Sequence, residues 1–330
     1  MNALKLAVIV LAVLVIVEAI AIAYLYQSQP RTSNVTKPIT QTQEIRIVSL
    51  TPSDTQILIA LGLGKYIVGV DKYSYELLKE LNETYLLPSN VTVLGHIIPP
   101  NISGILLLKP TVVVGEQGLL GSYVNQMKQA GLNLLLTNND FVSSFPQIEN
   151  NIYQIAEYFN RTQQAMELIQ WMNEMLSNFS SQEGNVTNVT YIIWINNDYT
   201  FYTAGGNVFI NNIISLAGGS NVFSGYSGYP VLSPSQLLIA KPQVLIAGEM
   251  YNISFTLQAI KSFPDGSQIP AIKDGKYYVL GNLATSLLNE PGPLAVYGVK
   301  LIHLILTGHA PHIINSTWVM ENIKPQLPVF

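Results

Sequence analysis

From residue 45 onward, short runs rich in β-branched residues alternate with stretches of helical periodicity, and this alternation limits the possible folds more than any other feature. In the first half, the pattern predicts helices over residues 55–62 and 123–130. The runs around them predict strands over 45–50, 67–70, 111–114 and 132–136. Repeated strand, helix, strand units favour a mainly parallel sheet with helices on both faces.

The second half of the chain repeats this plan, with strands expected over 191–195, 244–247 and 277–280 and helices over 209–216 and 294–306. Two segments, 106–116 and 238–249, match in detail. In each, a helix ends, a Lys-Pro pair turns the chain, and an apolar run leads to Gly-Glu. The sequence therefore predicts two α/β lobes of related plan. Glu249 lies one residue further from its Lys-Pro pair than Glu116 does, so the two glutamates need not be equivalent.

Between the two halves lies a long amphipathic stretch. Apolar residues recur mostly at three- and four-residue steps from Ile148 to Phe179, with no Gly or Pro among them. We expect one rigid helix over 148–180, about 45 Å long. The predicted fold is α/β, with an N-terminal lobe over 45–147 and a C-terminal lobe over 181–330. Each lobe is a mainly parallel sheet with flanking helices, and the long helix joins them.

The first 44 residues differ from the rest. Residues 6–25 form an apolar run that, as a helix, spans the roughly 30 Å core of a bilayer. Lys5 favours an N-terminus inside the cell, so residues 1–26 are predicted to be a transmembrane signal-anchor and 27–44 a flexible stalk. A cleaved signal peptide is the alternative, because Ala21-Ile22-Ala23 has the small-x-small form. Either way, we expect export. The anchor predicts a single-pass protein of the cell membrane with an extracellular binding domain.

Ten Asn-x-Ser/Thr sequons, more than chance predicts, provide independent support for export. They indicate a glycosylated outer surface, although a composition rich in Asn and Thr is the simpler alternative. The candidate glycosylation sites are Asn34, Asn82, Asn90, Asn101, Asn160, Asn178, Asn185, Asn188, Asn252 and Asn315.

The composition excludes several classes of chemistry. The chain has no cysteine, which excludes disulfides, thiolate catalysis and cysteine-type zinc sites. Only 11% of its residues are charged, against about 25% in average soluble proteins. Few ionisable groups predict a weak response of folding to pH, and we hypothesise that the protein faces an acidic exterior. No run of Lys or Arg is present, so no nucleic-acid partner is expected.

No catalytic motif is complete in the sequence. Gly62-Leu63-Gly64 lacks the third glycine of a dinucleotide fingerprint, and no P-loop is present. Residues 225–228 do not form the G-x-S-x-G elbow of a hydrolase. We therefore expect a binding protein and not an enzyme, with no cofactor and no metal site of its own.

The segments expected at the carboxyl ends of the strands are rich in aromatic, amide and glycine residues. In open α/β sheets, ligands bind at these ends, and such side chains suit a large, partly apolar ligand with a polar rim. Trp194 belongs to one of these segments. His96 lies in a loop before Pro99-Pro100, where it could reach a ligand or its metal, or where it is an ordinary loop histidine.

Several motifs occur in an order that resembles a known family. They are Arg46–Thr55 with Leu61–Gly64 and Val68–Val70, Leu107–Pro110 with Val112–Val114, Thr203–Gly205 with Ala217–Phe223, and Tyr229-Pro230 with Ser233–Leu238 and Lys241-Pro242. Together they resemble the cobalamin and iron-chelate binding proteins of ABC importers, the class III periplasmic binding proteins. The resemblance covers residues 45 to 310, nearly all of the expected exported part.

This resemblance implies two lobes joined by one rigid helix, with a ligand between them that is delivered to a membrane permease and its ATPase. Carried over by position, Tyr73, Tyr202 and Tyr229 are expected to contact the ligand, and Glu116 and Glu249 to border the cleft. The family usually places one glutamate per lobe on the permease-facing surface, but Ser103 and Ser235 occupy those positions here. Docking is therefore expected to use hydrogen bonds in place of two ion pairs.

The resemblance also implies the kind of cargo. A cobalamin-like corrinoid or a ferric chelate is expected, so that any metal arrives with the ligand. Haem or another solute on the same fold is the first alternative. A cell-surface adhesive glycoprotein or a surface enzyme is the second, and a buried nucleophile or metal triad near the cleft would favour the enzyme.

Overall fold

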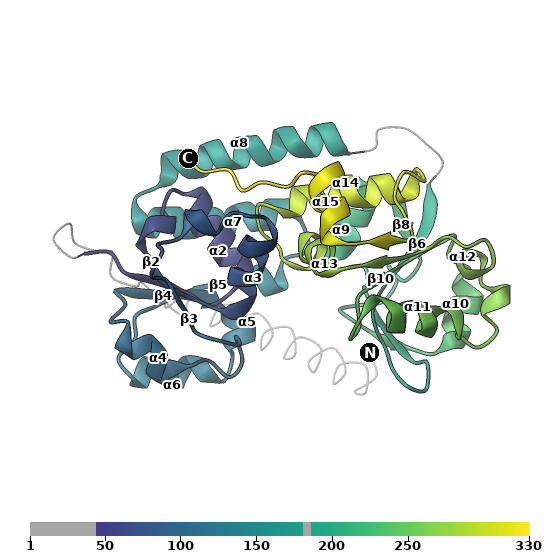
Figure 1. Ribbon diagram of the computed structural model, residues 1–330, viewed down its shortest axis with the longest axis horizontal. Helices are drawn as coiled ribbons and strands as arrows, with labels where there is room; N and C mark the ends of the chain where they lie inside the picture. The colour runs from purple at the N-terminus through teal and green to yellow at the C-terminus, as the bar shows by residue number, and fades with distance from the viewer. Residues whose placement is uncertain (1–43, 181–185) are drawn as a thin grey trace, which may run out of the picture. The chain divides into compact units, whose positions relative to one another are not determined.

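The computed structural model describes residues 44–180 and 186–330, which form two β-sheets, one in each half of the chain (Figure 1). The first sheet has the strand order β3-β2-β1-β4-β5, and all its neighbouring strands are parallel. Its strands are β1 Ile47–Ser49, β2 Ile67–Val70, β3 Thr92–Val93, β4 Val112–Glu116 and β5 Leu134–Thr137. The prediction of a mainly parallel sheet in this half is confirmed.

Helices cover both faces of the first sheet, which is why its central strands are apolar until their last residues, Ser49 and Glu116. Val112 and Val114 of β4 pack in one core, with side chains of α2 Pro52–Ala60 and α7 Phe145–Phe159. Val113 packs in another core on the opposite face, with α4 Ile102–Leu107 and α6 Tyr123–Gln129. The remaining helices of this lobe are α3 Lys72–Glu80, α5 Gln117–Leu120 and the 3-10 turns η1 Gly64–Tyr66, η2 Thr84–Leu86 and η3 Asn139–Phe141.

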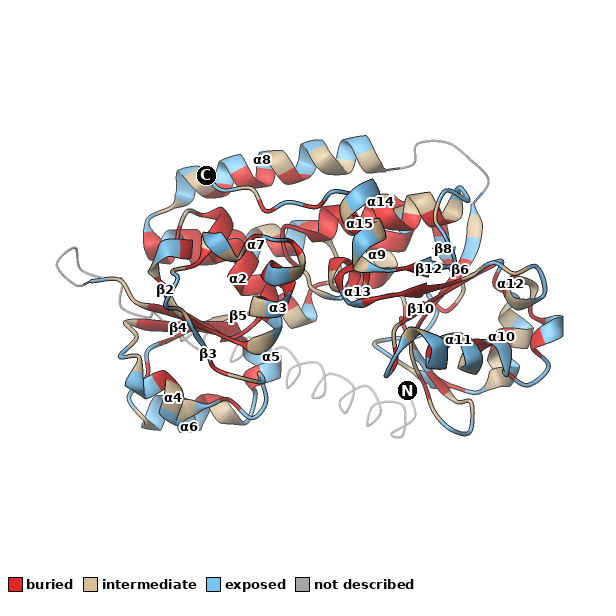
Figure 2. Cartoon of the chain, in the orientation of Figure 1, coloured by how far each residue is buried: buried red, intermediate tan, exposed pale blue. Residues whose placement is uncertain are grey.

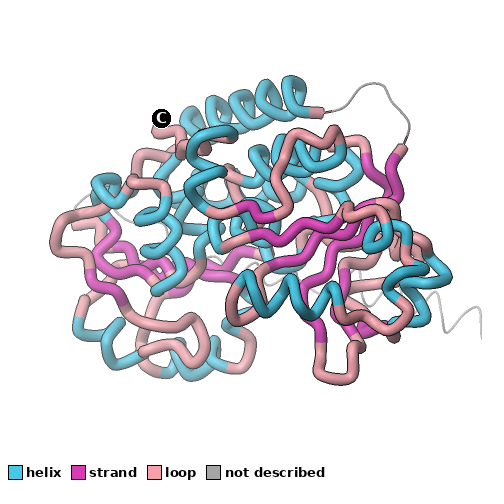
Figure 3. The backbone as a smooth tube through the Cα atoms, turned by 45° about the vertical axis from the view of Figure 1, so that its right-hand side comes forward, coloured by secondary structure: helices cyan, strands magenta, loops and turns pink. Residues whose placement is uncertain are grey.

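The second sheet mixes parallel and antiparallel pairs. Its strand order is β12-β11-β10-β6-β7-β9, with β8 also paired to β6. Figure 3 shows the strands in magenta with helices around them. The strands β8, β10, β11 and β12 run parallel to β6, whereas β7 is antiparallel to both β6 and β9. The strands are β6 Thr187–Ile195, β7 Phe201–Thr203, β8 Gly219–Asn221, β9 Val231–Leu232, β10 Val244–Gly248, β11 Tyr277–Leu280 and β12 Ile313–Ile314.

Two helices of the second lobe were predicted, and both are present. The helix expected over 209–216 is α9 Phe209–Leu216, and that expected over 294–306 is α14 Ala295–Leu306. The others are α10 Pro234–Ala240, α11 Ile253–Lys261, α12 Pro270–Lys273, α13 Asn282–Asn289, α15 Ser316–Asn322 and the turn η4 Gly266–Gln268. Figure 2 shows that the central strands of both sheets are largely buried.

The prediction of a single helix over 148–180 is wrong. The segment forms α7, which ends at Phe159, and α8 Thr162–Phe179, and the two helices pack against each other. Asn160 has φ 56° and lies in the left-handed region that ends helices, a conformation Asn tolerates better than most residues. Only α8, about 27 Å long, runs from the first lobe to α14 of the second (Figure 1).

The two lobes share a continuous core, because one cluster of buried apolar side chains extends from α2 and α7 through α8 to α9, α13 and α14. The end of the chain adds a second link that the predicted boundary of 181–330 did not anticipate. The backbone N–H of Phe330 donates to the carbonyl of Ala60 at 2.9 Å. Leu327 N–H donates to the Glu83 carboxylate at 3.2 Å. The C-terminal residues therefore pack on the first lobe.

A third link joins the lobes beneath their strand ends. Gln56 of α2 is 2% exposed, and its Nε2 donates to Glu290 at 3.2 Å while its Oε1 accepts from Leu294 N–H at 3.1 Å. Gly292 allows this approach, because a Cβ there would lie 2.6 Å from Gln56 Oε1. In addition, Ser316 Oγ donates to Glu80 of α3 at 2.8 Å. These contacts oppose a hinge movement between the lobes.

The predicted membrane anchor, residues 6–25, lies outside the described residues, as does the predicted stalk except for Glu44. Within residues 44–180 and 186–330, no helix is both long and apolar enough to cross a bilayer.

Candidate ligand-binding cleft

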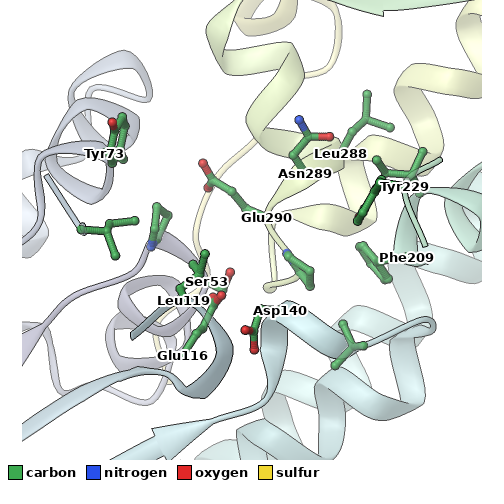
Figure 4. A pocket seen from close by; sticks show the side chains of 15 residues that line it. Ser53, Tyr73, Glu116, Leu119, Asp140, Phe209, Tyr229, Leu288, Asn289 and Glu290 are labelled. Atoms are coloured by element: carbon green, nitrogen blue, oxygen red, sulfur yellow. The ribbon is translucent and has the colours of Figure 1, made fainter. Parts of the chain in front are cut away.

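A cavity of about 310 Å³ lies between the two lobes (Figure 4). The carboxyl ends of two strands of the first sheet lie at this cavity, as expected for an open α/β sheet. Glu116 is the last residue of β4, and the lining residues Asp140 and Val142 follow β5. The first lobe contributes Pro52, Ser53, Tyr73, Ile97, Glu116, Leu119, Asp140 and Val142. The second lobe contributes Phe209, Ile210, Tyr229, Leu288, Asn289, Glu290 and Pro291.

Glu116 is the last residue of β4, and its carboxyl group is nearly enclosed. It is only 4% exposed and lies close to Ser53 and Asp140 (Figure 4). Burial raises the pKa of Glu116 well above its ordinary value, the nearby Asp54 raises it further, and a hydrogen bond with Ser53 opposes both effects. This carboxyl group therefore keeps its proton to a higher pH than an exposed glutamate does.

Asp140 lies in η3, directly after β5. Gly118 lies so close to the Asp140 carboxyl group that a side chain at position 118 would overlap it. Burial raises the pKa of Asp140, and hydrogen bonds from backbone amides, including those of Leu119 and Gly118, lower it. Its Oδ1 atom is buried and, among the described residues, has no hydrogen-bond partner.

Asp54, which is fully buried in α2, holds the η3 segment in place. Its carboxylate accepts hydrogen bonds from Thr51 Oγ1 at 2.8 Å, Thr137 Oγ1 at 2.9 Å and Asn139 Nδ2 at 2.9 Å. Asn139 in turn accepts from Asn151 Nδ2 of α7 at 2.8 Å. Burial raises the pKa of Asp54 to about 6 despite these three donors. The network fixes the loop that carries Asp140.

Glu290 enters the cavity from the second lobe. Burial raises the pKa of Glu290 to about 8, with a further contribution from Asp71 and opposing hydrogen bonds from Ser286 and Gln56. Asp71 is itself buried, and burial raises its pKa to about 6. It caps α3 by accepting from Tyr73 N–H at 2.8 Å, so it also positions the following aromatic residue.

Tyr73 and Tyr229 lie on opposite sides of the cavity, one on each lobe (Figure 4). The Tyr73 hydroxyl forms a hydrogen bond of 2.9 Å with His96 Nδ1, and the two rings meet edge to face at 5.7 Å. His96 does not line the cavity itself but supports the ring that does. Of the ligand-binding residues predicted from the sequence, the structure brings Tyr73, Glu116 and Tyr229 together around one cavity.

The other three predicted residues lie away from this cavity. Trp194 and Tyr202 are cross-strand partners on β6 and β7. Trp194 also belongs to a row of three aromatic rings. The ring centroid of Tyr251 lies 5.1 Å from that of Trp194 and 5.0 Å from that of Phe255. Glu249 follows β10 directly and is not among the lining residues.

Sequence reasoning missed Ser53, Asp140, Asn289 and Glu290. Asp140 carried a usable signal, because it closely follows a predicted strand, where ligands of α/β sheets bind. Glu290 had no such signal. It follows a helix, and only the packing of one lobe against the other brings it to the cavity.

The two predicted docking residues occupy equivalent, exposed positions. Ser103 lies in α4 and Ser235 in α10, and each precedes an exposed apolar residue by four positions. These residues are Leu107, 82% exposed, and Ile239, 74% exposed. Both helices are followed by a lysine in the left-handed region, Lys109 at φ 47° and Lys241 at φ 48°.

All eight sequon asparagines within the described residues are exposed. Three of them have a local structural role, because their side chains accept hydrogen bonds from helix N-termini: Asn101 in α4, Asn252 in α11 and Asn315 in α15. Asn34 and Asn185 lie outside the described residues.

Two α/β lobes with a cavity between them define the fold of a two-lobed binding protein. Within the described chain, no three His, Cys, Asp or Glu side chains are arranged to hold a metal ion. The sequence over residues 47–283 matches the family described as periplasmic binding protein, and the chain belongs to that family.

The chain is similar to curated proteins over most of their length. An ABC transporter substrate-binding lipoprotein of Bacillus subtilis strain 168, YvrC, is 24% identical over 263 residues, or 77% of each chain. The vitamin B12-binding protein of Vibrio vulnificus strain CMCP6 is 24% identical over 265 residues, which cover 78% of this chain and 88% of that one.

A solved structure supports the fold. The apo form of the periplasmic heme-binding protein RhuT from Roseiflexus sp. RS-1 superposes with a TM-score of 0.68 at 23% identity. The superposition covers 82% of this chain and 100% of that one. At this level of identity, the likeness concerns the fold alone.

Proposed function

We propose that this chain is the solute-binding component of an ABC importer, which captures a cobalamin-like corrinoid or a ferric chelate between its lobes. The observation that carries the proposal is the cavity between the two lobes, with Tyr73 and Tyr229 facing it from opposite sides. Aromatic faces combined with carboxyl, amide and hydroxyl groups suit a large ligand with an apolar body and polar substituents. The curated relatives named as substrate-binding and vitamin B12-binding proteins support the same function.

The size of the cavity fits one edge of such a ligand. About 310 Å³ is near the lower limit for small-molecule sites, so a corrinoid would place part of its periphery there. Its remaining body would extend outward between the lobes. Because several cross-lobe contacts oppose hinge movement, we infer that the ligand enters a largely preformed site.

Delivery requires a partner that recognises both lobes at once. The duplicated surface formed by Ser103 with Leu107 and Ser235 with Ile239 is suited to a permease that acts with an ATPase. Hydroxyl and apolar groups at these positions would make docking less sensitive to salt than two ion pairs would be.

A ligand screen tests the function directly. The full-length chain, purified in detergent, should show a melting temperature that rises on addition of cyanocobalamin, a ferric siderophore or haem. At a free ligand concentration 100 times Kd, binding adds about 2.7 kcal/mol to the free energy of unfolding. Native mass spectrometry and visible absorbance should detect cargo that co-purifies. If none of the three ligand classes stabilises the protein or co-purifies with it, the proposed function is wrong.

We also propose that residues 6–25 anchor the chain and that exposed sequons carry glycans. In the native host, the protein should remain in the membrane fraction after an alkaline carbonate wash and be released by detergent. Intact mass should decrease after enzymatic or chemical deglycosylation. Recovery in the soluble fraction with a mass that lacks residues 1–23 would instead support the cleaved signal peptide.

A further inference from the structure

Apart from the two tyrosine hydroxyls, the ionisable groups that line the cavity are all carboxyl groups. Glu116, Asp140 and Glu290 line it, whereas the described lining residues include no Lys, Arg or His. Asp54 and Asp71 add two buried carboxyl groups close behind, near enough to raise the pKa values of Glu116 and Glu290. An anionic substituent that entered this cavity would meet carboxyl groups and no fixed cation.

Two of these carboxyl groups have hydrogen-bonding capacity left for a ligand. Asp140 Oδ1 is buried without a partner in the described parts of the chain, and Glu116 is 4% exposed with Ser53 as its hydrogen-bonding neighbour. Buried polar atoms are almost always satisfied in folded proteins. Asp140 also lines the cavity, so a ligand that carries a donor can reach its carboxyl group.

The substituent that best complements this lining is a donor. An ammonium or amide N–H can donate to an ionised carboxylate, and charge-assisted bonds of this kind are strong. Burial favours the neutral form of Glu116, which can donate its own proton to a carbonyl oxygen. A primary amide both donates and accepts, so it suits either protonation state. A carboxylate substituent would be repelled by the ionised form.

Building on the proposed function, we propose that this cleft selects cargo that presents primary amides or cationic groups to Glu116 and Asp140, and discriminates against cargo that presents carboxylates. Among large metal-carrying ligands, this favours amidated corrinoids over carboxylate-bearing porphyrins and chelates.

Matched ligand pairs test the selectivity. The full-length chain in detergent is titrated calorimetrically at pH 7 with dicyanocobinamide and dicyanocobyrinic acid, which share a ring but carry amides or carboxylates. A second pair is iron protoporphyrin and its dimethyl ester. We expect the member without carboxylates to bind at least about tenfold more tightly in any pair that binds. Equal or tighter binding of the carboxylate member would overturn the selectivity while leaving the proposed function intact. If no member of either pair binds, the protein binds neither corrinoids nor porphyrins. That result would overturn this inference and the proposed corrinoid cargo together.

Variants identify the responsible residues. Glu116→Gln and Asp140→Asn, each with a melting curve to establish folding, should reduce the affinity ratio within a pair by at least about threefold. Glu174→Gln is the matched control, because it removes one carboxylate from an exposed position on α8 and should leave the ratio unchanged. If either cleft variant folds and keeps the full ratio, the residue it changes does not determine selectivity. If both do, the assignment is overturned.

Discussion

At the scale of single residues, Asp54 and Asp140 show how two neighbouring carboxyl groups differ in role. Asp54 accepts hydrogen bonds from three side chains, is fully buried and does not line the cavity, so it serves the fold. Asp140 leaves one buried oxygen unpaired beside the cavity, within the described chain. The sequence around each is similarly polar, and only the contacts separate a structural carboxylate from one that can face a ligand.

Ser103 and Ser235 allow a test of where ligand binding and docking occur. Both are exposed on helices outside the cavity lining. We expect Ser103→Glu and Ser235→Glu to leave ligand affinity unchanged within about twofold, because neither side chain reaches the cavity. Tyr229→Ala is the comparison, and loss of its aromatic face should weaken binding at least about tenfold. Calorimetric titration measures all three, and a large loss of affinity in either serine variant would show that these residues belong to the ligand site.

At the scale of elements, the sequence predicted strands and helices well where the pattern is local. The helix over 209–216 and the strand over 277–280 have the predicted bounds, because apolar periodicity and flanking turn residues determine them. The division of 148–180 into α7 and α8 was not predictable in the same way. Asn160 adopts the left-handed conformation that ends α7, and the apolar spacing of three and four residues continues on both sides of it without marking the break.

The cleft was predictable only in part, for a related reason. Glu116 and the aromatic residues follow strands within one lobe, so the strand-end rule finds them. Glu290 reaches the cavity because Gln56 and Gly292 hold the two lobes together, and the two residues bonded there are separated by 234 positions in the sequence. A contact of that range leaves no local pattern that a single sequence could reveal.

At the scale of the whole molecule, buried carboxyl groups change the expected response to pH. The low content of charged residues predicted a weak response. Burial, however, raises the pKa values of Asp54 and Asp71 to about 6 and of Glu290 to about 8. In the unfolded chain these groups titrate near their ordinary values of about 4. Between about pH 4 and pH 8, the native state therefore binds more protons than the unfolded state does.

Stability should therefore rise toward acid. The contribution of these groups to the free energy of unfolding is fully present below about pH 4. It is lost as pH rises through 6 to 8, because the groups ionise more easily in the unfolded chain, where their pKa values are lower. Each unit of pKa shift corresponds to about 1.4 kcal/mol, so we expect the melting temperature to fall by roughly 5 °C or more between pH 5 and pH 8. Such a profile would suit a protein that works in an acidic exterior.

Melting curves of the ligand-free chain at pH 4, 5, 6, 7 and 8 measure this response. Glu290→Gln should flatten the part of the profile between pH 6 and pH 8, because glutamine keeps a hydrogen bond with Gln56 available but cannot ionise. Glu174→Gln, which changes an exposed carboxylate, should keep the wild-type slope. A melting temperature that increases from pH 5 to pH 8 would contradict the raised pKa values, and with them the link between the buried carboxyl groups and an acidic exterior.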